Sequence, residues 1–226
     1  MTKSPTAAMI FCAGFGTRMG ALTKHIPKPM VPLQGRPMVD HAIDLLHDAG
    51  IGRLVANIHY LSKEIEPHLA SKGVVVSPET PEILDTGGGL KFALPLLRSE
   101  PVITLNPDAA WTGPNPVSRL VDAWHPDMQA LLLLVPLSKA TTRRDTGDFS
   151  LKKGEIERNG DYLYTGLQIV RTDRLVDIDD QVFSLNKYWD HLASNGPLHG
   201  TVYEGRWCDI GNPEGLAAAE EMLSRV

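Results

Sequence analysis

The alternation of strand-like and helix-like segments over the first 136 residues is the feature that most constrains the fold of this chain. Short apolar runs, typical of buried strands, occur at 7–13, 54–58, 74–76, 101–105 and 130–135. Between them, apolar residues recur at helical spacing near 38–49, 62–69, 90–97 and 116–125. Strands that alternate with helices in this way form a mainly parallel sheet with helices on both faces. We therefore expect an α/β fold.

The character of the sequence changes after Pro136, where residues 138–165 are polar and rich in turns. The patterns in this part predict short strands at 148–151, 155–158 and 162–170, a helix near 184–194, a strand at 201–203 and a final helix after Asn212. No internal repeat or low-complexity linker interrupts the chain. We therefore expect a single domain over residues 1–226.

The charge and composition exclude several classes of protein. The formal net charge is −5 and the basic residues are scattered, which disfavours a nucleic-acid-binding protein. The longest apolar run, 130–135, is much shorter than a membrane helix, and the first residues lack the apolar stretch of a signal peptide. The two cysteines and eight histidines show no metal-binding spacing. We expect a cytoplasmic protein that acts on small molecules and is a monomer or homodimer.

The loop after the first strand contains the residues best suited to chemistry. Gly14, Gly16 and Gly20 place backbone N–H groups in a tight loop, and Arg18 and Lys28 add two cations. A triphosphate requires close backbone approach, hydrogen-bond donors and positive charge. The spacing fits neither the P-loop pattern GxxxxGK[ST] nor the dinucleotide-binding pattern GxGxxG. The glycines alone are explained equally well by a turn that joins a strand to a helix.

Two further sequence motifs make the interpretation of this loop more specific. Gly16-Thr17-Arg18 is followed by Pro27-Lys28-Pro29, whose prolines stiffen the chain around a lysine suited to a phosphate. The run resembles the signature of the sugar-1-phosphate nucleotidylyltransferases, roughly AGxGTRxxPLTxxxPKPxxPxxxxP. The matching positions are Ala13, Gly14, Gly16, Thr17, Arg18, Leu22, Thr23, Pro27, Lys28, Pro29, Pro32 and Pro37. Ala21 stands where the family usually has proline.

The resemblance extends along most of the chain. Residues 84–89 (LDTGGG) are similar to the family's segment at the base and ribose, and residues 106–108 (NPD) stand where many members have N-G-D. Residues 207–213 (WCDIGNP) are similar to an element near the end of short members. Among these the likeness is greatest to uridylyltransferases of cell-wall recycling, which share the LxTGGG segment, Gly147-Asp148-Phe149 and Thr165-Gly166.

The resemblance implies a Rossmann-like, three-layer α/β/α fold with a mixed, mainly parallel central sheet. Residues 7–136 would form the nucleotide-binding half and residues 137–226 the sugar-phosphate-binding half. The implied partners are a nucleoside triphosphate, with UTP favoured, and a sugar 1-phosphate, with no nucleic acid and no membrane. The sugar phosphate attacks the α-phosphorus and pyrophosphate leaves. Positioning and charge neutralisation would supply the catalysis.

The resemblance also assigns the site residues. Arg18 and Lys28 would be catalytic, and Asp108 and Asp209 would hold Mg²⁺, which prefers carboxylate and phosphate oxygens. The implied nucleotide-binding residues are Ala13, Gly14, Gly16, Thr17, Arg18, Lys28, Glu82, Thr86, Gly87 and Gly88. The implied sugar-phosphate-binding residues are Asn106, Asp148 and Gly166. The glycines would let the backbone approach the nucleotide and its base.

Several alternatives stay open. An aspartate after a strand, such as Asp108 or Asp209, is commonly a turn or helix cap, and Asp148 fits a surface turn equally well. Pro107 replaces the usual glycine and removes one backbone N–H, which is compatible with a module that binds a nucleotide without turnover. A guanylyltransferase acting on mannose 1-phosphate is the main rival activity. A nicotinamide-dependent oxidoreductase is disfavoured because GxGxxG is absent.

Overall fold

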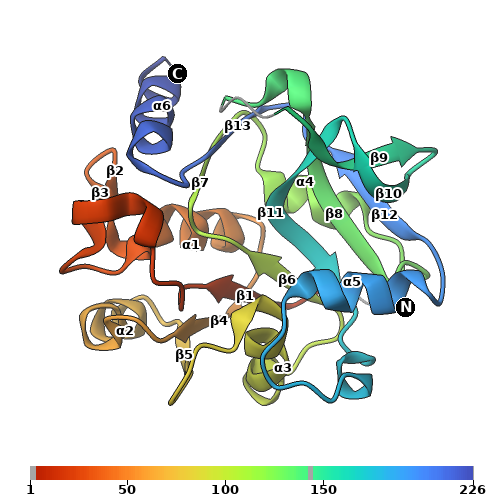
Figure 1. The fold of residues 1–226 in the computed structure, drawn as a ribbon, viewed down its shortest axis with the longest axis horizontal. Coiled ribbons are helices and arrows are strands. Elements are labelled where there is room, and N and C mark those ends of the chain that lie inside the picture. The colour runs from red at the N-terminus through yellow and green to blue at the C-terminus, as the bar shows by residue number, and fades with distance from the viewer. Residues whose placement is uncertain (1–3, 142–144, 226) are drawn as a thin grey trace.

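A nine-stranded sheet forms the centre of the molecule. The computed structural model describes residues 4–141 and 145–225 (Figure 1). In spatial order the strands are β5 (Val75–Pro78), β4 (Arg53–Ile58), β1 (Ala7–Phe11), β6 (Val102–Leu105), β11 (Tyr162–Val170), β8 (Ala130–Pro136), β12 (Leu198–Val202), β10 (Glu155–Gly160) and β9 (Gly147–Lys152). The sheet thus contains strands from both predicted halves of the chain.

The first part of the sheet is parallel and the second part is mixed. β1 pairs in parallel with both β4 and β6, and β4 pairs in parallel with β5. β11 runs antiparallel between β6 and β8, with a break in register between Tyr164 and Gln168. β12 is again parallel to β8. The predicted α/β class with a mixed sheet is confirmed.

The helices cover both faces of the sheet. They are α1 (Met38–Asp48), α2 (Ser62–Ser71), α3 (Asp85–Leu97), α4 (Pro116–Ala123) and α5 (Leu185–Ala193). A further helix, α6 (Pro213–Ser224), packs instead on residues 109–112 and 206–209, away from this sheet. Asn115 caps α4 by accepting from Val117 N at 2.8 Å, and Asn212 caps α6 by accepting from Gly215 N at 2.8 Å. In both helices proline follows the cap, where its missing N–H costs nothing.

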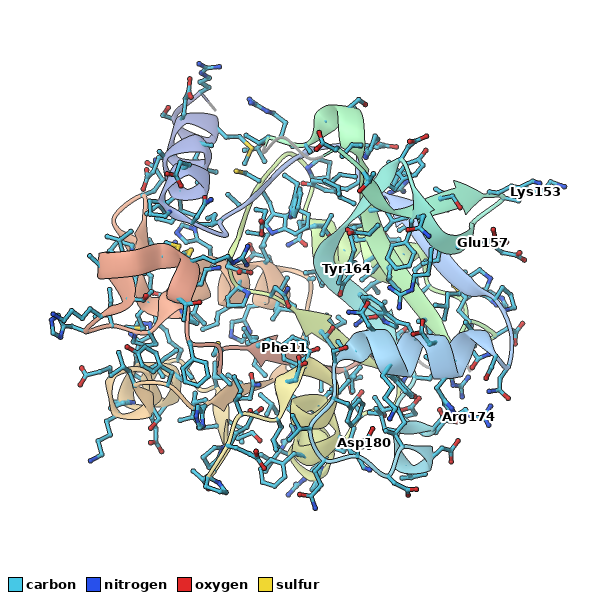
Figure 2. All side chains as sticks on the ribbon, viewed as in Figure 1. Phe11, Lys153, Glu157, Tyr164, Arg174 and Asp180 are labelled. Carbon is cyan, nitrogen blue, oxygen red and sulfur yellow. The ribbon has the colours of Figure 1, made fainter. Side chains whose placement is uncertain are left out.

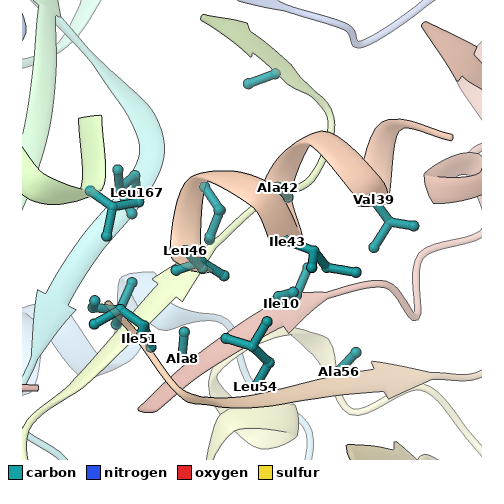
Figure 3. Close-up of a cluster of buried hydrophobic side chains, with 14 of the residues drawn as sticks. Ala8, Ile10, Val39, Ala42, Ile43, Leu46, Ile51, Leu54, Ala56 and Leu167 are labelled. Carbon is teal, nitrogen blue, oxygen red and sulfur yellow. The ribbon is translucent and has the colours of Figure 1, made fainter. Parts of the chain in front are cut away.

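Two apolar cores lie on opposite faces of the sheet. In one, α1, α2 and α4 pack on β1, β4 and β8; in the other, α3 and α5 pack on the reverse side of the same sheet. Figure 3 shows Val39, Ile43 and Leu46 of α1 above Ile10 of β1 and Leu54 of β4. Each such fully buried aliphatic side chain contributes about 1.5–3 kcal/mol. None of the helices described in the structure has the length and apolar character needed to cross a bilayer.

Two small sheets stand apart from the central one. β2 (Pro32–Leu33) pairs with β3 (Arg36–Pro37), and β7 (Ala109–Thr112) pairs antiparallel with β13 (Arg206–Asp209). The sequence did not predict β7, because this four-residue strand is stabilised by its pairing with the distant β13. The pairing of β7 with β13 places Asp209 opposite Ala109, which comes 100 positions earlier in the sequence.

Candidate functional site

The carboxyl ends of the parallel strands define the edge of the sheet on which the predicted residues gather. The glycine loop follows β1, and Asn106-Pro107-Asp108 follows β6, the strand directly beside β1. Ligands of open α/β sheets bind outside these strand ends. A cavity of about 230 Å³ opens here, lined by Phe11, Cys12, Ala13, Gly14, Lys28, Pro29, Asn57, Ile83, Asp85, Thr86, Asn106, Pro107 and Asp108. We call it the first cavity.

Gly16 lets the loop pack closely on Lys28. Its φ is +64°, and a Cβ there would lie 2.9 Å from the Cβ of Lys28. The Thr23 hydroxyl donates to the Gly16 carbonyl at 3.0 Å and closes the loop through the 3₁₀ helix η1 (Thr17–Thr23). A side chain at this position would push Lys28 away, so glycine is required by contact as well as by conformation.

Lys28 is held against a carboxylate. Its Nζ donates to Oδ2 of Asp108 at 2.5 Å, and its side chain is only 12% exposed. Lys28 opens the short helix η2 (Lys28–Met30), in which Met30 N donates to the carbonyl of Pro27 at 2.8 Å. Pro27 is extended directly before this short helix, so the chain turns at Lys28.

Asp209 comes to the same place through β13. Its register partner on β7 is Ala109, and Ile210 N donates to the carbonyl of Asp108 at 2.8 Å. Arg18 lies close to Asp209, because a Cβ at Gly211 would lie 2.9 Å from Nη1 of Arg18 and 3.1 Å from Oδ2 of Asp209. The structure thus places Arg18 near Asp209, and brings the backbone beside Asp209 to that of Asp108, whose carboxylate pairs with Lys28.

A second cavity of about 300 Å³ continues from the first. Its lining residues are Thr86, Asn106, Asp108, Ala109, Asp148, Phe149, Arg158, Tyr164, Thr165, Gly166, Leu185, Asn186, Trp189, Trp207 and Asp209. Thr86, Asn106 and Asp108 line both cavities and mark where they meet. Figure 2 shows Phe11, which lines the first cavity, and Tyr164, which lines the second, near the middle of the view.

The residues predicted for a sugar phosphate lie together in this second cavity. Asn106 N donates to the carbonyl of Gly166 at 2.9 Å, and a Cβ at Gly166 would lie 2.9 Å from the Cβ of Asn106. Gly166 has φ +84° at the irregular step of β11. Asp148 Oδ2 accepts from Tyr164 N at 2.9 Å. Asp148 therefore supports the backbone of β11 just before that step.

Aromatic rings form one wall of the second cavity. The rings of Tyr164 and Trp189 meet edge to face with centroids 5.0 Å apart, and those of Phe149 and Trp189 do so at 5.8 Å. The indole N–H of Trp189 donates to Oε1 of buried Gln168 at 2.8 Å, and Gln168 in turn donates to the Thr104 hydroxyl at 3.0 Å. This buried network fixes the orientation of Trp189.

Gly87 and Gly88 have a packing role that the sequence analysis did not predict. Both lie inside α3, and both amides donate to the carbonyl of Phe183, at 2.9 and 3.0 Å. A Cβ at Gly87 would lie 2.4 Å from the Phe183 ring, and a Cβ at Gly88 would lie 2.1 Å from the carbonyl oxygen of Gln181. The close packing of residues 181–183 on α3 therefore requires glycine at both positions.

Glu79 is a buried carboxylate that the sequence analysis missed. It is 1% exposed, accepts from Asn57 Nδ2 at 2.7 Å and accepts from Leu84 N at 2.8 Å. Asn57 accepts in turn from Cys12 N at 2.8 Å, so the network links β1, β4 and the segment before α3. Glu82, predicted instead, is exposed and lines neither cavity. The one sequence signal for Glu79 was its place directly after the apolar strand β5, which the sequence analysis did not use.

The remaining predicted residues divide between the cavities and the surface. Ala13 and Gly14 line the first cavity, and Thr86 lines both while its hydroxyl accepts from Leu185 N at 2.9 Å. Thr17 and Arg18 are exposed on η1 and line neither cavity. Burial, aided by the charge of Asp108, raises the pKa of the Cys12 thiol above its usual range, so this thiol stays protonated in the cavity wall.

The carboxylates Asp108 and Asp209 fit a magnesium ion. Carboxylate oxygens are hard donors of the kind that Mg²⁺ prefers, and both residues line the second cavity. Oδ2 of Asp108 pairs with Lys28, while its Oδ1 makes no hydrogen bond within the described residues. Residues 4–141 and 145–225 contain no group of three or more side chains that could hold a metal. An ion held by these two carboxylates would take its other ligands from phosphate oxygens and water.

Comparison with known proteins agrees with this arrangement. Residues 8–142 match the MobA-like NTP transferase domain. The chain belongs to this family. The N-acetylmuramate alpha-1-phosphate uridylyltransferase of Caulobacter vibrioides is 35% identical to it, and the alignment covers 100% of both chains. The enzyme of the same name from Neisseria meningitidis is 28% identical, with 95% of this chain and 97% of the relative covered.

Other similar proteins include enzymes named for a different activity. The mannose-1-phosphate guanyltransferase of Gibberella zeae is 28% identical over 91% of this chain, which spans 61% of that relative's length. Among solved structures, HddC from Yersinia pseudotuberculosis complexed with GMP-PN has a TM-score of 0.77 at 21% identity, covering 96% of this NTP transferase and 99% of HddC. UDP-glucose pyrophosphorylase complexed with UDP-glucose has a TM-score of 0.80 at 15% identity, covering 98% and 99%.

These comparisons confirm two of the predictions made from the sequence. The fold is that of solved nucleotidyltransferases, and the chain is an enzyme of the NTP transferase family. The Pro-Lys-Pro and glycine-loop residues that suggested nucleotidyl transfer lie inside the matched region, residues 8–142.

Proposed function

We propose that this NTP transferase joins UTP and N-acetylmuramate 1-phosphate to give UDP-N-acetylmuramate and pyrophosphate in a magnesium-dependent reaction. The observation that carries the proposal is the 35% identity to the Caulobacter vibrioides uridylyltransferase over the full length of both chains. The site geometry supports the same chemistry, because Asp108 lines both cavities, with Lys28 beside it in the first cavity and Asp209 in the second. The first cavity would hold the nucleotide and the second the sugar 1-phosphate.

The reaction needs no strong base in the protein. The phosphate of a sugar 1-phosphate is already an anion near neutral pH, so one of its oxygens attacks the α-phosphorus directly. A new phosphorus–oxygen bond forms, and the bond from the α-phosphorus to the oxygen that bridges to the β-phosphorus breaks. The electron pair of that bond leaves with pyrophosphate. The work of the protein is to align the two phosphates and to neutralise their charge.

Lys28 and Arg18 are the cations placed for that work. Lys28 is fixed by its contact with Gly16 and by its ion pair with Asp108, so it meets an incoming α-phosphate without reorganising. When a phosphate binds, Lys28 would pair with the phosphate as well as with Asp108. The carboxylate oxygens of Asp108 would then be available to coordinate Mg²⁺. Arg18, which lies beside Gly211 and Asp209, would neutralise charge on the leaving pyrophosphate.

Magnesium, held by Asp108 and Asp209, would supply further neutralisation of the nucleotide phosphates. Asn106, Asp148 and Gly166 would bind the sugar phosphate from the floor of the second cavity. The whole chain would act as one catalytic unit, a proposal supported by the single sheet to which both halves contribute strands.

One rival activity has a specific observation behind it. The similarity to mannose-1-phosphate guanyltransferases favours GTP and mannose 1-phosphate as an alternative pair of substrates, at lower identity than the uridylyltransferase. A third possibility is binding without turnover, motivated by Pro107, which is buried in the wall of the first cavity without a backbone N–H.

A pyrophosphate-release assay separates the three. UTP, GTP, dTTP and CTP are each paired with the 1-phosphates of N-acetylmuramate, N-acetylglucosamine, mannose and glucose, with Mg²⁺ and with excess EDTA. The proposal predicts the highest kcat/KM for UTP with N-acetylmuramate 1-phosphate and no turnover in EDTA. Preference for GTP with mannose 1-phosphate would establish the rival. Nucleotide-dependent thermal stabilisation without pyrophosphate release in any combination would establish the binding module.

A further inference from the structure

Arg158 is a cation in the wall of the second cavity for which the reaction above has no use. It lies on β10 and lines the cavity together with Asn186 and Trp189 of α5. It is the one lysine or arginine among the described residues that line this cavity, whose other charged groups are carboxylates. A positive charge in a pocket for a sugar points to an anionic group on that sugar.

The guanidinium of Arg158 is held in a fixed orientation. Its central carbon lies 5.2 Å from the ring centroid of Phe149 and 5.3 Å from that of Trp189. Nη1 donates to Oδ1 of Asn186 at 2.8 Å, and Nη2 donates to Oδ1 of Asp190 at 2.9 Å. Trp189 is itself held by Gln168. Arg158 is therefore positioned before any ligand arrives, which reduces the entropy lost on binding.

Arg158 keeps donors available for a ligand. A guanidinium has five N–H groups, and Nε of Arg158 makes no hydrogen bond within the described residues. The side chain is 39% exposed, and its carboxylate partner Asp190 is 69% exposed. Because an ion pair this exposed to solvent is weak, a carboxylate on a ligand can join it or replace Asp190 at little cost.

The position of Arg158 indicates that its guanidinium contacts the sugar and not the reacting phosphates. The phosphates meet where Thr86, Asn106 and Asp108 line both cavities, next to Lys28. Arg158 lines the second cavity only and is held from α5, by Asn186 and Asp190. The hydroxyl groups of a neutral hexose need no guanidinium, whereas a carboxylate matches its planar donor fork.

We propose that Arg158 recognises a carboxylate on the sugar and makes the enzyme selective for acidic sugar 1-phosphates. The inference rests on the proposed function and names the feature of the substrate that the second cavity selects. N-acetylmuramate belongs to this class, since it differs from N-acetylglucosamine by a lactyl ether that ends in a carboxylate. The two 1-phosphates are therefore a matched pair with and without the group that Arg158 binds.

The test compares this matched pair on wild type and on Arg158→Gln. Removal of the charge should lower kcat/KM for N-acetylmuramate 1-phosphate by roughly 10- to 100-fold, as expected for one charged hydrogen-bonded contact. The value for N-acetylglucosamine 1-phosphate should change by less than about 2-fold, as for an ordinary surface substitution. KM for the nucleotide should stay the same for both sugars.

Arg174→Gln is the matched control. Arg174 is also 39% exposed and also pairs with a carboxylate, Asp177 at 3.2 Å, but it lines neither cavity and lies at the lower right in Figure 2. It should leave both sugars unaffected. Asp190→Asn removes the competitor of the ligand carboxylate, and should maintain or increase the preference for the acidic sugar. Equal losses for both sugars in Arg158→Gln would show that Arg158 only braces α5, and would overturn the proposal.

Calorimetric binding of each sugar 1-phosphate to the same variants makes the test independent of turnover. A tighter Kd for the acidic sugar that disappears in Arg158→Gln supports the inference even if the chain releases no pyrophosphate, an outcome in which the proposed function fails. The enzyme could instead turn over neutral sugar 1-phosphates and show no preference for the acidic one in kcat/KM or in Kd. That result would keep nucleotidyl transfer as the activity and would overturn the inference about Arg158.

Discussion

Nζ of Lys28 lies 2.5 Å from Oδ2 of Asp108, although 80 residues separate the two in the sequence. The pair joins the glycine loop after β1 to the strand end of β6. Lys28 lies in the wall of the first cavity, and Asp108 lines both cavities. The cation proposed to bind the α-phosphate and the carboxylate proposed to bind Mg²⁺ thus hold each other in position.

Lys28→Met should lower kcat/KM for pyrophosphate release by about 10²-fold or more, because it removes preorganised positive charge from the site of bond formation. The fold should survive, since the methionine stem fills the same space. Lys63→Met, on the exposed face of α2, is the control and should behave as wild type. Undiminished turnover in Lys28→Met would show that the proposed role of this lysine is wrong.

Asp209→Asn should raise the Mg²⁺ concentration needed for half-maximal rate and lower the maximal rate by about 10²-fold, because a neutral amide is a weaker ligand for a hard cation. Titration of activity with Mg²⁺ measures both. Asp127→Asn replaces a carboxylate that is 92% exposed and lies in neither cavity. A Mg²⁺ titration that is identical for Asp209→Asn and wild type would contradict the assignment of the metal ligands.

Gly166→Ala should destabilise the protein by about 1–3 kcal/mol more than Gly154→Ala. The two glycines have nearly the same φ, +84° and +86°, so the backbone cost of alanine is common to both. A Cβ at Gly154 meets nothing within 4 Å, whereas one at Gly166 meets Asn106 at 2.9 Å. Denaturant unfolding gives the difference; equal losses would mean that Asn106 moves aside freely.

Glu79→Gln should cost about 1–3 kcal/mol of unfolding free energy. Glu79 accepts from Asn57 Nδ2 and from Leu84 N, so a glutamine places its own N–H₂ group against one of these donors. The nucleotide KM should rise as well, since Asn57 lines the first cavity. Glu82→Gln, at an exposed position three residues on, should stay within about 0.5 kcal/mol of wild type.

Asp40 should make the protein sensitive to acid. Burial would raise the pKa of this carboxyl, but hydrogen bonds from His68 at 2.6 Å and from Lys72 at 3.2 Å outweigh it and hold the pKa below 3.8. Because the folded pKa is lower than the unfolded one, the stabilisation is fully present above the unfolded pKa and is lost as pH falls through the folded pKa. Unfolding free energies measured from pH 6 downward should show this loss.

Asp40→Asn removes that pH dependence and serves to assign it. The variant should be less stable than wild type at neutral pH, and the two should converge as the pH falls below the folded pKa of Asp40. Asp44→Asn, which breaks an exposed pair with Arg36, should keep the wild-type pH profile. Wild type and Asp40→Asn with parallel profiles would assign the acid sensitivity to other groups.

Most secondary structure was predictable from local pattern. The apolar runs at 54–58, 101–105 and 130–135 lie within one residue of the observed β4, β6 and β8, because buried parallel strands are continuous apolar segments. The final helix begins at Pro213 after its Asn212 cap, as the cap signal indicated. β7 escaped prediction because its stability comes from pairing with β13, not from its own four residues.

Site residues that belong to a sequence motif were predictable, whereas site residues that are distinguished only by their burial or packing were not. Lys28, Asp108 and Gly166 stand in recognisable segments, and the structure brings them to the cavities or their wall. Glu79 and Arg158 have no such motif. Glu79 differs from Glu82 only in being buried against Asn57. Arg158 differs from other surface arginines only in the two aromatic rings that contact its guanidinium.

The sequence by itself determined the order of strands and helices, the glycine loop and the stiff Pro-Lys-Pro segment, since these depend on backbone preferences and apolar spacing within a few residues. Only the tertiary structure decided that β13 pairs with β7, so that Asp209 meets Asp108, and that Gly87 and Gly88 pack on residues 181–183. The physical reason is that these contacts join residues distant in the chain, and their energy depends on the burial and partners that folding creates.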